Sequence, residues 1–270
     1  MSTPPPNPLA TAEPWNLVAN DYAIEVVPQF QLFAADALRL AQLPPSPRIA
    51  DVATGPGTLA LMAAANGATV SAIDFSATMI ANLQRRAAES GVTTVEVVQG
   101  DGQNLPFDSG SYDAAFSMFG LIFFPDRAAG FRELHRVLRP GGRAVVSSWA
   151  PFRMPFALIM DSIRELLPGL PFGQGQAPLG EPEGFAQELR EAGFRDAQIH
   201  QITHTVPAPS LAAFWKSAQR TTAPLVLLQK NLGETEWSKV SEGVYGRLRN
   251  QLGEGEIKIE FAAYLGVGIK

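Results

Sequence analysis

Three aspartates lie where successive strands of this chain are expected to end. Asp51 lies in the apolar segment RIADVA, four residues before Gly55, whereas Asp74 ends ATVSAID and Asp101 follows TTVEVVQG. Because open α/β sheets bind ligands at the carboxyl ends of their strands, we expect the three acids to share one site. A buried carboxylate is costly without a partner, which a cationic or amine-bearing ligand would supply. An acid at the end of the second strand also suits the two hydroxyls of a ribose.

The segment Arg48–Ala60 predicts the corner that such a ligand would approach. It reads as a buried strand to Ala53, a turn with Gly55 and Gly57, and a helix that begins at Thr58. Glycine has no Cβ, so this turn can take unusual backbone angles and let a ligand come close. A strand, a glycine-rich turn and a helix together are typical of nucleotide-binding sites, including those of dinucleotide-dependent enzymes.

The elements that must position these residues alternate between strand and helix. Helical spacing is expected over 58–66, 76–90 and 127–138. This alternation is typical of a parallel sheet that is covered by helices and joined by right-handed crossovers. Apolar runs bounded by turn residues predict strands that end at Ala53, Asp74, Gln99, Ser117 and Trp149.

The regions on either side of this alternating core have a different pattern. The first fourteen residues are polar and rich in proline, which predicts a disordered tail. Residues 15–43 predict a helix that Pro28 should break, followed by a stiff PPSP linker. After Trp149 we expect helices over 156–167 and 183–192, a strand over 194–206, helices across 210–252 and a strand over 255–270.

Composition excludes several classes of function. The 270 residues are 46% hydrophobic and 17% charged, which is typical of an ordinary globular core. A formal net charge of -5 and the lack of a basic run argue against a nucleic-acid-binding groove. Without cysteine the chain has no disulfide, thiolate metal site or cysteine nucleophile. No signal peptide or membrane span is recognisable, so we expect a cytoplasmic protein.

Five sequence blocks, in order and with matching spacing from Arg48 to Trp149, resemble those of a known family. It is the class I S-adenosylmethionine-dependent methyltransferases, in the branch that includes the ubiquinone and menaquinone C-methyltransferases (methyltransferase type 11). The glycine-rich corner alone would not separate this family from dinucleotide-dependent enzymes. The blocks are DVATGPGTLA (51–60), AIDFS (72–76), GDGQNLPF (100–107), YDAAFSMFGLIFFPD (112–126) and RVLRPGGR (136–143).

The resemblance implies an α/β fold, with a Rossmann-like, doubly wound, seven-stranded sheet, mostly parallel with one antiparallel strand, plus a helical cap. The chain would then be a single methyltransferase domain, 1–270. Its parts would be a tail (1–14), an N-terminal helical cap (15–47), the cofactor-binding core (48–149) and a C-terminal part (150–270). The last two strands would form the antiparallel pair at the sheet edge, and a helical insertion at about 209–252 would cover the active site.

The resemblance also implies which residues hold S-adenosylmethionine and its product S-adenosylhomocysteine. Asp74 would hold both ribose hydroxyls, since Ser76 is the better cap for the following helix. Asp51 would contact the methionine ammonium, directly or through water, or else accept bonds from neighbouring backbone amides. The other implied contacts are Thr54, Gly55 and Gly57 in the glycine-rich turn, Phe75 and Met79 on the adenine ring, Asp101, Gly102 and Gln103 on the adenine edge, and Ser117 and Phe119 beneath the sulfonium.

The sequence does not single out a catalytic group. Tyr22, in the pattern WNxxAxxY, could hydrogen-bond the methionine carboxylate or the substrate, or could pin its helix to the sheet. His200 and His204 share one face of a strand and are expected to be solvated, without a metal, since no third ligand is recognisable. His135 is expected to be structural or exposed. Aromatic residues predict the substrate pocket: Trp149, Phe152, Phe156, Phe172, Phe214 and Trp215.

The function expected from these residues is methyl transfer to O, N or C of a small, largely apolar or aromatic molecule. A general base, if one is needed, would come from Tyr22, His200 or His204, and the protein would act as a monomer or a homodimer. One alternative is an S-adenosylmethionine-binding protein that catalyses a non-methylating cyclisation or rearrangement. A remote alternative is an NAD-dependent oxidoreductase, which Asp51 and the blocks GDGQNLPF and RVLRPGGR do not suit.

Overall fold

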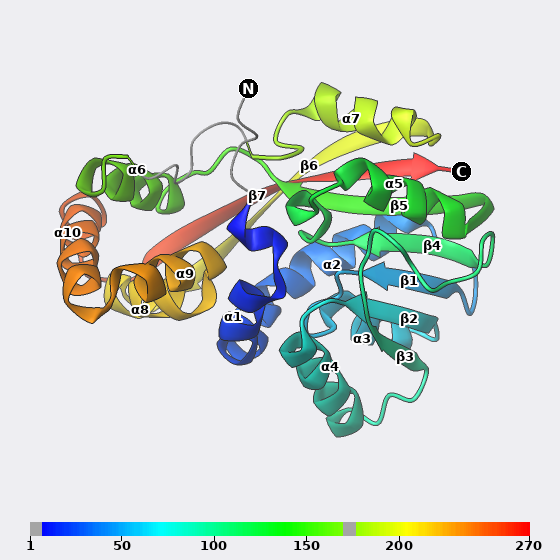
Figure 1. Ribbon diagram of the computed structural model, residues 1–270, viewed down its shortest axis with the longest axis horizontal. Coiled ribbons are helices and arrows are strands. Elements are labelled where there is room, and N and C mark those ends of the chain that lie inside the picture. Colours follow the sequence, from blue (N-terminus) through cyan, green and yellow to red (C-terminus); the bar gives the residue numbers. More distant parts are fainter. Residues whose placement is uncertain (1–6, 170–176) are drawn as a thin grey trace.

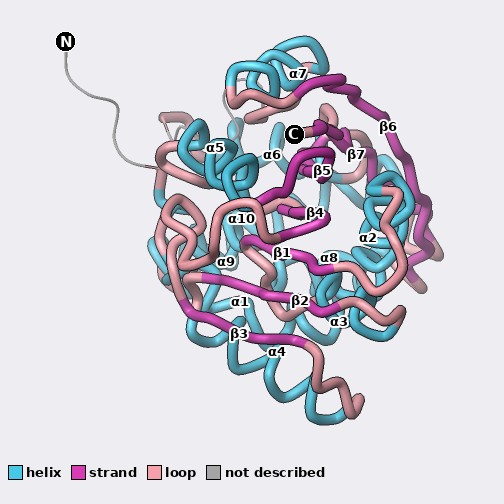
Figure 2. The backbone as a smooth tube through the Cα atoms, turned by 90° about the vertical axis from the view of Figure 1, so that its right-hand side faces the viewer, coloured by secondary structure: helices cyan, strands magenta, loops and turns pink. Residues whose placement is uncertain are grey.

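A single seven-stranded sheet forms the centre of the protein. The structure is a computed structural model that describes residues 7–169 and 177–270. The strand order is β3-β2-β1-β4-β5-β7-β6, and Figure 2 shows the strands in this succession. β7 runs antiparallel to both of its neighbours, and the other pairs are parallel, so the predicted fold is confirmed. The strands are β1 (Arg48–Val52), β2 (Thr69–Asp74), β3 (Val95–Gln99), β4 (Tyr112–Ser117), β5 (Leu138–Trp149), β6 (Arg195–Ala208) and β7 (Ile257–Ile269).

Helices cover both faces of the sheet, because successive residues of a strand point to opposite sides. In β1, Ile49 belongs to the core that includes residues of α2 and α3, whereas Ala50 belongs to the core that includes residues of α5 and α7. Both residues are fully buried, which explains why the parallel strands read as continuous apolar runs. The helices that cover the two faces are α2 (Val27–Ala41), α3 (Thr58–Ala65), α4 (Ala77–Glu89), α5 (Arg127–Val137) and α7 (Pro182–Glu191).

The N-terminal segment forms two helices, separated where proline predicts a break. α1 (Ala12–Glu25) ends just before Val26, and Pro28 lies in the first turn of α2. Proline is tolerated there because the first backbone N–H groups of a helix have no partner within it. The expected break at Pro28 is therefore confirmed, and it starts a second helix that leaves the first in a new direction.

The prediction of a disordered tail over 1–14 is wrong for residues 8–14, and residues 1–6 lie outside the described residues. Pro8–Ala10 form a 3-10 helix (η1), and α1 begins at Ala12. Asn7 caps the 3-10 helix through the backbone N–H of Leu9. The indole N–H of Trp15 donates to the Leu9 carbonyl at 2.9 Å. The proline content suggested disorder, but Trp15 anchors the segment that precedes it through this hydrogen bond.

A helical cap lies beyond the end of the sheet, on a ribbon formed by β6 and β7 (Figure 1). β5 pairs with β7 only as far as Trp149 and Ala263, whereas β6 stays paired to Ala208 and Ile257. α1 contacts α4 of the core and α8 and α9 of the cap, so it bridges the two. No helix in the described part of the chain is long and apolar enough to cross a membrane. The cap helices are α6 (Phe156–Leu166), α8 (Leu211–Thr221), α9 (Ala223–Leu232) and α10 (Glu234–Leu252).

Candidate functional site

A cavity of about 1240 Å³ lies between the carboxyl ends of the central strands, the N-terminal helices and the cap. Its position is the edge of the sheet beside the point where strand order reverses, which is where open α/β sheets bind ligands. Pockets for one drug-sized ligand occupy about 300–1,000 Å³, so this cavity has room for a cofactor together with a second small molecule.

Asp51 holds the glycine-rich turn and the start of α3 through hydrogen bonds, and it also lines the cavity. Its side chain is 1% exposed, and Oδ2 accepts bonds from the Thr54 hydroxyl at 2.6 Å and the Ala60 amide at 3.1 Å. Burial raises the pKa of Asp51 to about 7, although these two hydrogen bonds oppose the rise. The alternative that Asp51 bonds a neighbouring amide therefore holds, and its position in the cavity wall also leaves it accessible to a ligand.

Asp74, the last residue of β2, connects the glycine-rich turn after β1 to the turn that precedes α4. Its Oδ2 accepts from the Gly55 amide at 2.9 Å and its Oδ1 from the Ser76 amide at 2.9 Å. Ser76 caps α4 by accepting from the Met79 amide, so the role of helix cap belongs to the serine as expected. Asp74 is 6% exposed, and burial raises its pKa to about 6. A cationic ligand beside Asp51 and Asp74 would stabilise their ionised forms.

The loop after β3 forms another side of the cavity. Asp101 accepts from the Gln103 amide at 2.8 Å, and Gln103 Oε1 accepts from the Asp126 amide at 2.7 Å. A Cβ at Gly102 would lie 2.5 Å from the Phe124 ring and 2.8 Å from Val52. Any larger residue would displace these two side chains, so the backbone of the loop packs directly against Phe124 and Val52.

Gly57 and Ser117, two of the predicted contacts, do not line the cavity. Gly57 has φ +78°, and a Cβ there would lie 2.1 Å from Leu83, so this glycine makes room for the Leu83 side chain of α4. Ser117 is fully buried, and its hydroxyl accepts from the Leu121 amide at 3.1 Å. The predicted contacts that do line the cavity are Asp51, Thr54, Gly55, Asp74, Phe75, Met79, Asp101, Gly102, Gln103 and Phe119.

Aromatic rings line another part of the cavity, at the ends of β4 and β5. Phe119 stacks on Trp149 with ring centroids 4.1 Å apart, and Phe30 meets both rings edge-on at 5.0 and 5.6 Å. Phe119 has φ +58° and Ala53 has φ +57°, an uncommon conformation for residues with a side chain, at the ends of β4 and β1. The amide of Phe119 donates to the Ser147 hydroxyl at 2.8 Å, which holds the strained residue in place.

The predicted aromatic pocket is formed in part. Trp149, Phe152, Phe156 and Phe214 line the cavity. Trp215 belongs instead to the core of the cap, where its indole N–H donates to the Ser241 hydroxyl at 3.0 Å. Phe172 lies outside the described residues. Phe30 of α2 and Phe261 of β7 complete the wall, and no sequence motif marks either of them as part of a pocket.

The three candidates for a catalytic group are separated by the fold. Tyr22 lines the cavity, and burial together with the charge of Asp74 raises its pKa, so its hydroxyl keeps its proton and can donate. His200 and His204 do not line it. His204 is only partly solvated, because α2 packs against it and leaves 25% of its side chain exposed. Its Nε2 lies 2.8 Å from Asp36, and its ring meets Phe33 at 4.7 Å.

No histidine is among the described residues that line the cavity, and His135 packs against Phe194 at 5.1 Å. The described residues contain no cluster of three or more His, Asp or Glu side chains that could hold a metal. The wall also has a polar part that was not predicted, where Arg153 pairs with Glu260. These two residues are 107 positions apart, so no local pattern could have connected them.

Comparison with known proteins agrees with this site. A family model described as "Methyltransferase domain" matches residues 49–142. An uncharacterized protein of Mycobacterium bovis is 36% identical over 129 residues, which are 48% of this chain and 47% of that protein. This chain thus spans about half the length of the first curated relatives that it matches.

A demethylmenaquinone methyltransferase of Clavibacter sepedonicus is 35% identical over 191 residues, covering 66% of this chain and 76% of that enzyme. Among solved structures, phosphoethanolamine N-methyltransferase 2 of Haemonchus contortus, in complex with S-adenosylhomocysteine, has the same fold. The TM-score is 0.58 at 16% identity, over 93% of this chain and 56% of that one. These relatives do not favour the oxidoreductase or the non-methylating alternative. The chain belongs to the class I S-adenosylmethionine-dependent methyltransferases, in the branch of the demethylmenaquinone methyltransferases, and S-adenosylmethionine is its cofactor.

Proposed function

We propose that this protein acts in the cytoplasm and transfers a methyl group from S-adenosylmethionine to O, N or C of a small, largely apolar or aromatic molecule. The observation that carries the proposal is one large cavity with two different sides. Buried acids lie at the ends of β1 and β2, and stacked aromatic rings lie at the ends of β4 and β5, beside Phe30 of α2. The first side suits a cationic nucleoside, and the second suits a flat apolar acceptor.

The proposed contacts assign each wall of the first side to one part of the cofactor. Asp74 holds the ribose hydroxyls, and Asp51 attracts the methionine ammonium, directly or through water. The pKa values of about 6 and about 7 support this assignment, because both carboxylates gain from a nearby positive charge. Further proposed contacts are Thr54 and Gly55 at the amino-acid portion, Asp101, Gly102 and Gln103 at the adenine edge, Phe75 and Met79 at the adenine face, and Phe119 beneath the sulfonium.

The protein contributes alignment and exclusion of water rather than an unusual side chain. S-adenosylmethionine, when bound, would supply a methyl group that is activated by the positive charge on its sulfur. Holding two reactants in line can supply about 7–11 kcal/mol of the barrier. Phe30, Phe119 and Trp149 would hold a flat acceptor in place, and Tyr22 would donate a hydrogen bond to the methionine carboxylate or to the acceptor.

Labelled methyl donor tests this proposal without knowledge of the acceptor. The purified protein is incubated with a small-molecule extract and S-adenosylmethionine carrying an isotopic methyl group, and products are analysed by mass spectrometry. We expect at least one low-molecular-weight product that carries the label, and much less of it with the Asp74→Ala variant when the donor concentration is near the wild-type dissociation constant. An extract component that is consumed without gaining the label would instead indicate a non-methylating reaction and would overturn the proposal.

A further inference from the structure

The loop between β3 and β4 has no secondary structure of its own over residues 100–111. Its first part, at Asp101–Gln103, lines the cavity. Its second part carries Leu105 and Phe107, whose side chains are buried in the core with α5. A loop of this length usually moves unless other elements hold its backbone, and ligand-binding residues need a rigid support.

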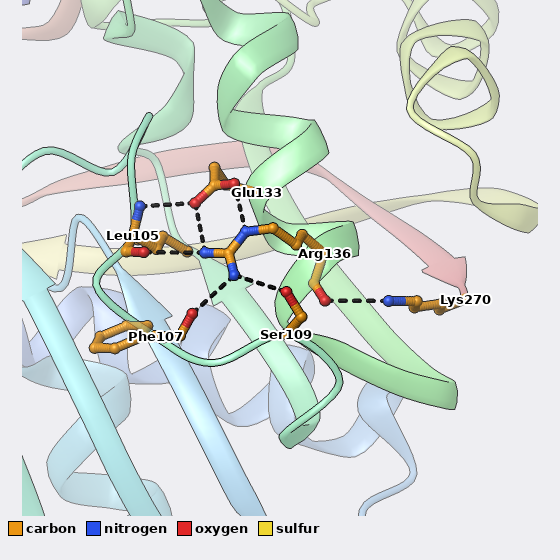
Figure 3. A network of polar contacts seen from close by, with 6 residues as sticks. All are labelled: Leu105, Phe107, Ser109, Glu133, Arg136 and Lys270. Carbon is orange, nitrogen blue, oxygen red and sulfur yellow. Dashed lines mark hydrogen bonds and ion pairs between the residues drawn. The ribbon is translucent and has the colours of Figure 1, made fainter.

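One pair of side chains on α5 holds the backbone of this loop (Figure 3). Glu133 accepts the Leu105 amide at 2.7 Å, and Arg136 donates to the Leu105 carbonyl at 3.0 Å. Arg136 also donates to the Phe107 carbonyl at 2.8 Å and to the Ser109 hydroxyl at 3.0 Å. Both polar backbone groups of Leu105 are therefore bound by the same pair.

The pair is itself fixed by two parallel bonds. Nε and Nη2 of Arg136 donate to Oε1 and Oε2 of Glu133 at 2.7 and 2.8 Å. Hydrogen bonds from Arg136 lower the pKa of Glu133, so the carboxylate stays ionised. Only the planar guanidinium can face a carboxylate with one edge and two carbonyls with its remaining N–H groups; a lysine ammonium presents a single point of charge.

A second attachment lies at the other end of the same helix. Gln103 accepts the Asp126 amide at 2.7 Å, and Asp126 is the N-cap of α5. α5 therefore holds the loop at Gln103, the last residue of the cavity-lining turn, and again from Leu105 to Ser109. Since a Cβ at Gly102 would collide with Phe124, the turn has little freedom to settle elsewhere.

We propose that Glu133 and Arg136 are positioning residues for the cofactor, which fix the loop so that Asp101–Gln103 meet the adenosine half. The inference rests on the proposed function, because it takes this loop as the adenine-binding wall. Neither side chain lines the cavity. Their effect on the ligand is transmitted through the backbone of Leu105, two residues after Gln103.

The test compares Arg136→Lys and Glu133→Gln with a matched control, Arg127→Lys. Arg127 lies on the same helix and forms the same two-bond pair, with Glu188, but makes no hydrogen bond to the loop. Calorimetry measures the dissociation constants of S-adenosylhomocysteine and of 5′-methylthioadenosine, which lacks the amino-acid portion. Hydrogen exchange of residues 100–109 and 53–58 is measured in the ligand-free proteins, together with their thermal midpoints.

We expect both loop variants to bind both ligands about tenfold more weakly, as for loss of one charged hydrogen bond. Exchange should rise over 100–109 and stay unchanged over 53–58, while the control matches wild type in affinity and exchange. Equal affinity losses in the control, or wild-type affinity with wild-type exchange in both loop variants, would overturn the inference. If wild type binds neither ligand, the proposed function fails, and the exchange of the ligand-free proteins still decides whether the pair anchors the loop. Should Arg136→Lys fail to fold, Glu133→Gln and Ser109→Ala carry the same comparison.

Discussion

Burial of the ionised Asp51 and Asp74 side chains destabilises the folded protein. A cationic cofactor beside them would offset this cost. Both are almost fully buried, and each has a pKa well above that of a free aspartate. Their hydrogen bonds come from the Thr54 hydroxyl and from the amides of Gly55, Ala60 and Ser76, so the acids also hold the corner in shape. At the residue scale, the proposed assignment therefore makes both the structure of the corner and cofactor binding depend on the same two carboxylates.

The affinity for S-adenosylmethionine should rise with pH. Because the folded-state pKa values are raised to about 6 and about 7, the stability contributed by these acids is present below about pH 4 and is lost as pH rises through 6–7. A cationic ligand reverses this loss by favouring the ionised acids. We expect affinity to increase on the order of tenfold between pH 5.5 and 7.5, with proton release on binding. Calorimetry in two buffers of different ionisation enthalpy measures both quantities; an affinity independent of pH would contradict the assignment.

Replacement of Asp74 by alanine should weaken cofactor binding by about 2–3 kcal/mol, through loss of charge-assisted bonds to the ribose. The substitution also leaves the Gly55 and Ser76 amides without their acceptor, so we expect about 1–3 kcal/mol less stability. Asp196→Asn, at an exposed position on β6, is the control and should change neither quantity. Titration calorimetry together with thermal unfolding separates the two effects, and unchanged affinity in Asp74→Ala would mean that the ribose lies elsewhere.

At the scale of elements, α1 is the piece that connects the cofactor side to the cap. Asn16 bonds the Ser76 hydroxyl at the start of α4 at 2.6 Å. Toward the cap, two glutamates of α1 form ion pairs: Glu25 with Arg220 of α8, and Glu13 with Lys230 of α9. Since these ion pairs are partly exposed, each contributes little alone. Opening of a lid that includes α1 would therefore break these two ion pairs at little cost.

The lid model predicts how hydrogen exchange responds to ligand. On addition of S-adenosylhomocysteine, protection should rise in α1 and in the insertion at about 209–252 together, because a closed lid excludes water. In Arg220→Gln the two segments should lose this coupling, and protection of α1 should rise less. If both segments stay equally exposed while turnover proceeds, the lid model is wrong and a larger partner must complete the site.

How well the sequence predicts each element depends on how local its causes are. β1 and the helix after it follow from an apolar run and from Gly55 and Gly57 in one short segment, and Pro28 marks its own helix boundary. His204 is different, because Asp36, which covers it, lies 168 residues away. Residues 8–14 were mispredicted for the same reason, since the burial that orders them comes from tertiary contacts.

At the scale of the whole molecule, the chain divides its two tasks between two regions. The sheet and its glycine-rich corner provide the acids, and the ribbon of β6 and β7 carries a cap that encloses the remaining volume (Figure 1). The corner was predictable because its residues are close in sequence. The cavity was predictable only in outline, because its aromatic wall brings together residues from four separate parts of the chain: Phe30, Phe119, Trp149 and Phe261.

The central claim is that this cavity binds S-adenosylmethionine at the acid-bearing strand ends. The most direct test is titration calorimetry of the full chain at pH 7.5 with S-adenosylmethionine, S-adenosylhomocysteine and NAD in parallel. We predict micromolar dissociation constants for the first two ligands, at one site, and no heat with NAD. Binding of NAD without binding of either sulfur-containing ligand would contradict the account, even though the fold would remain as described.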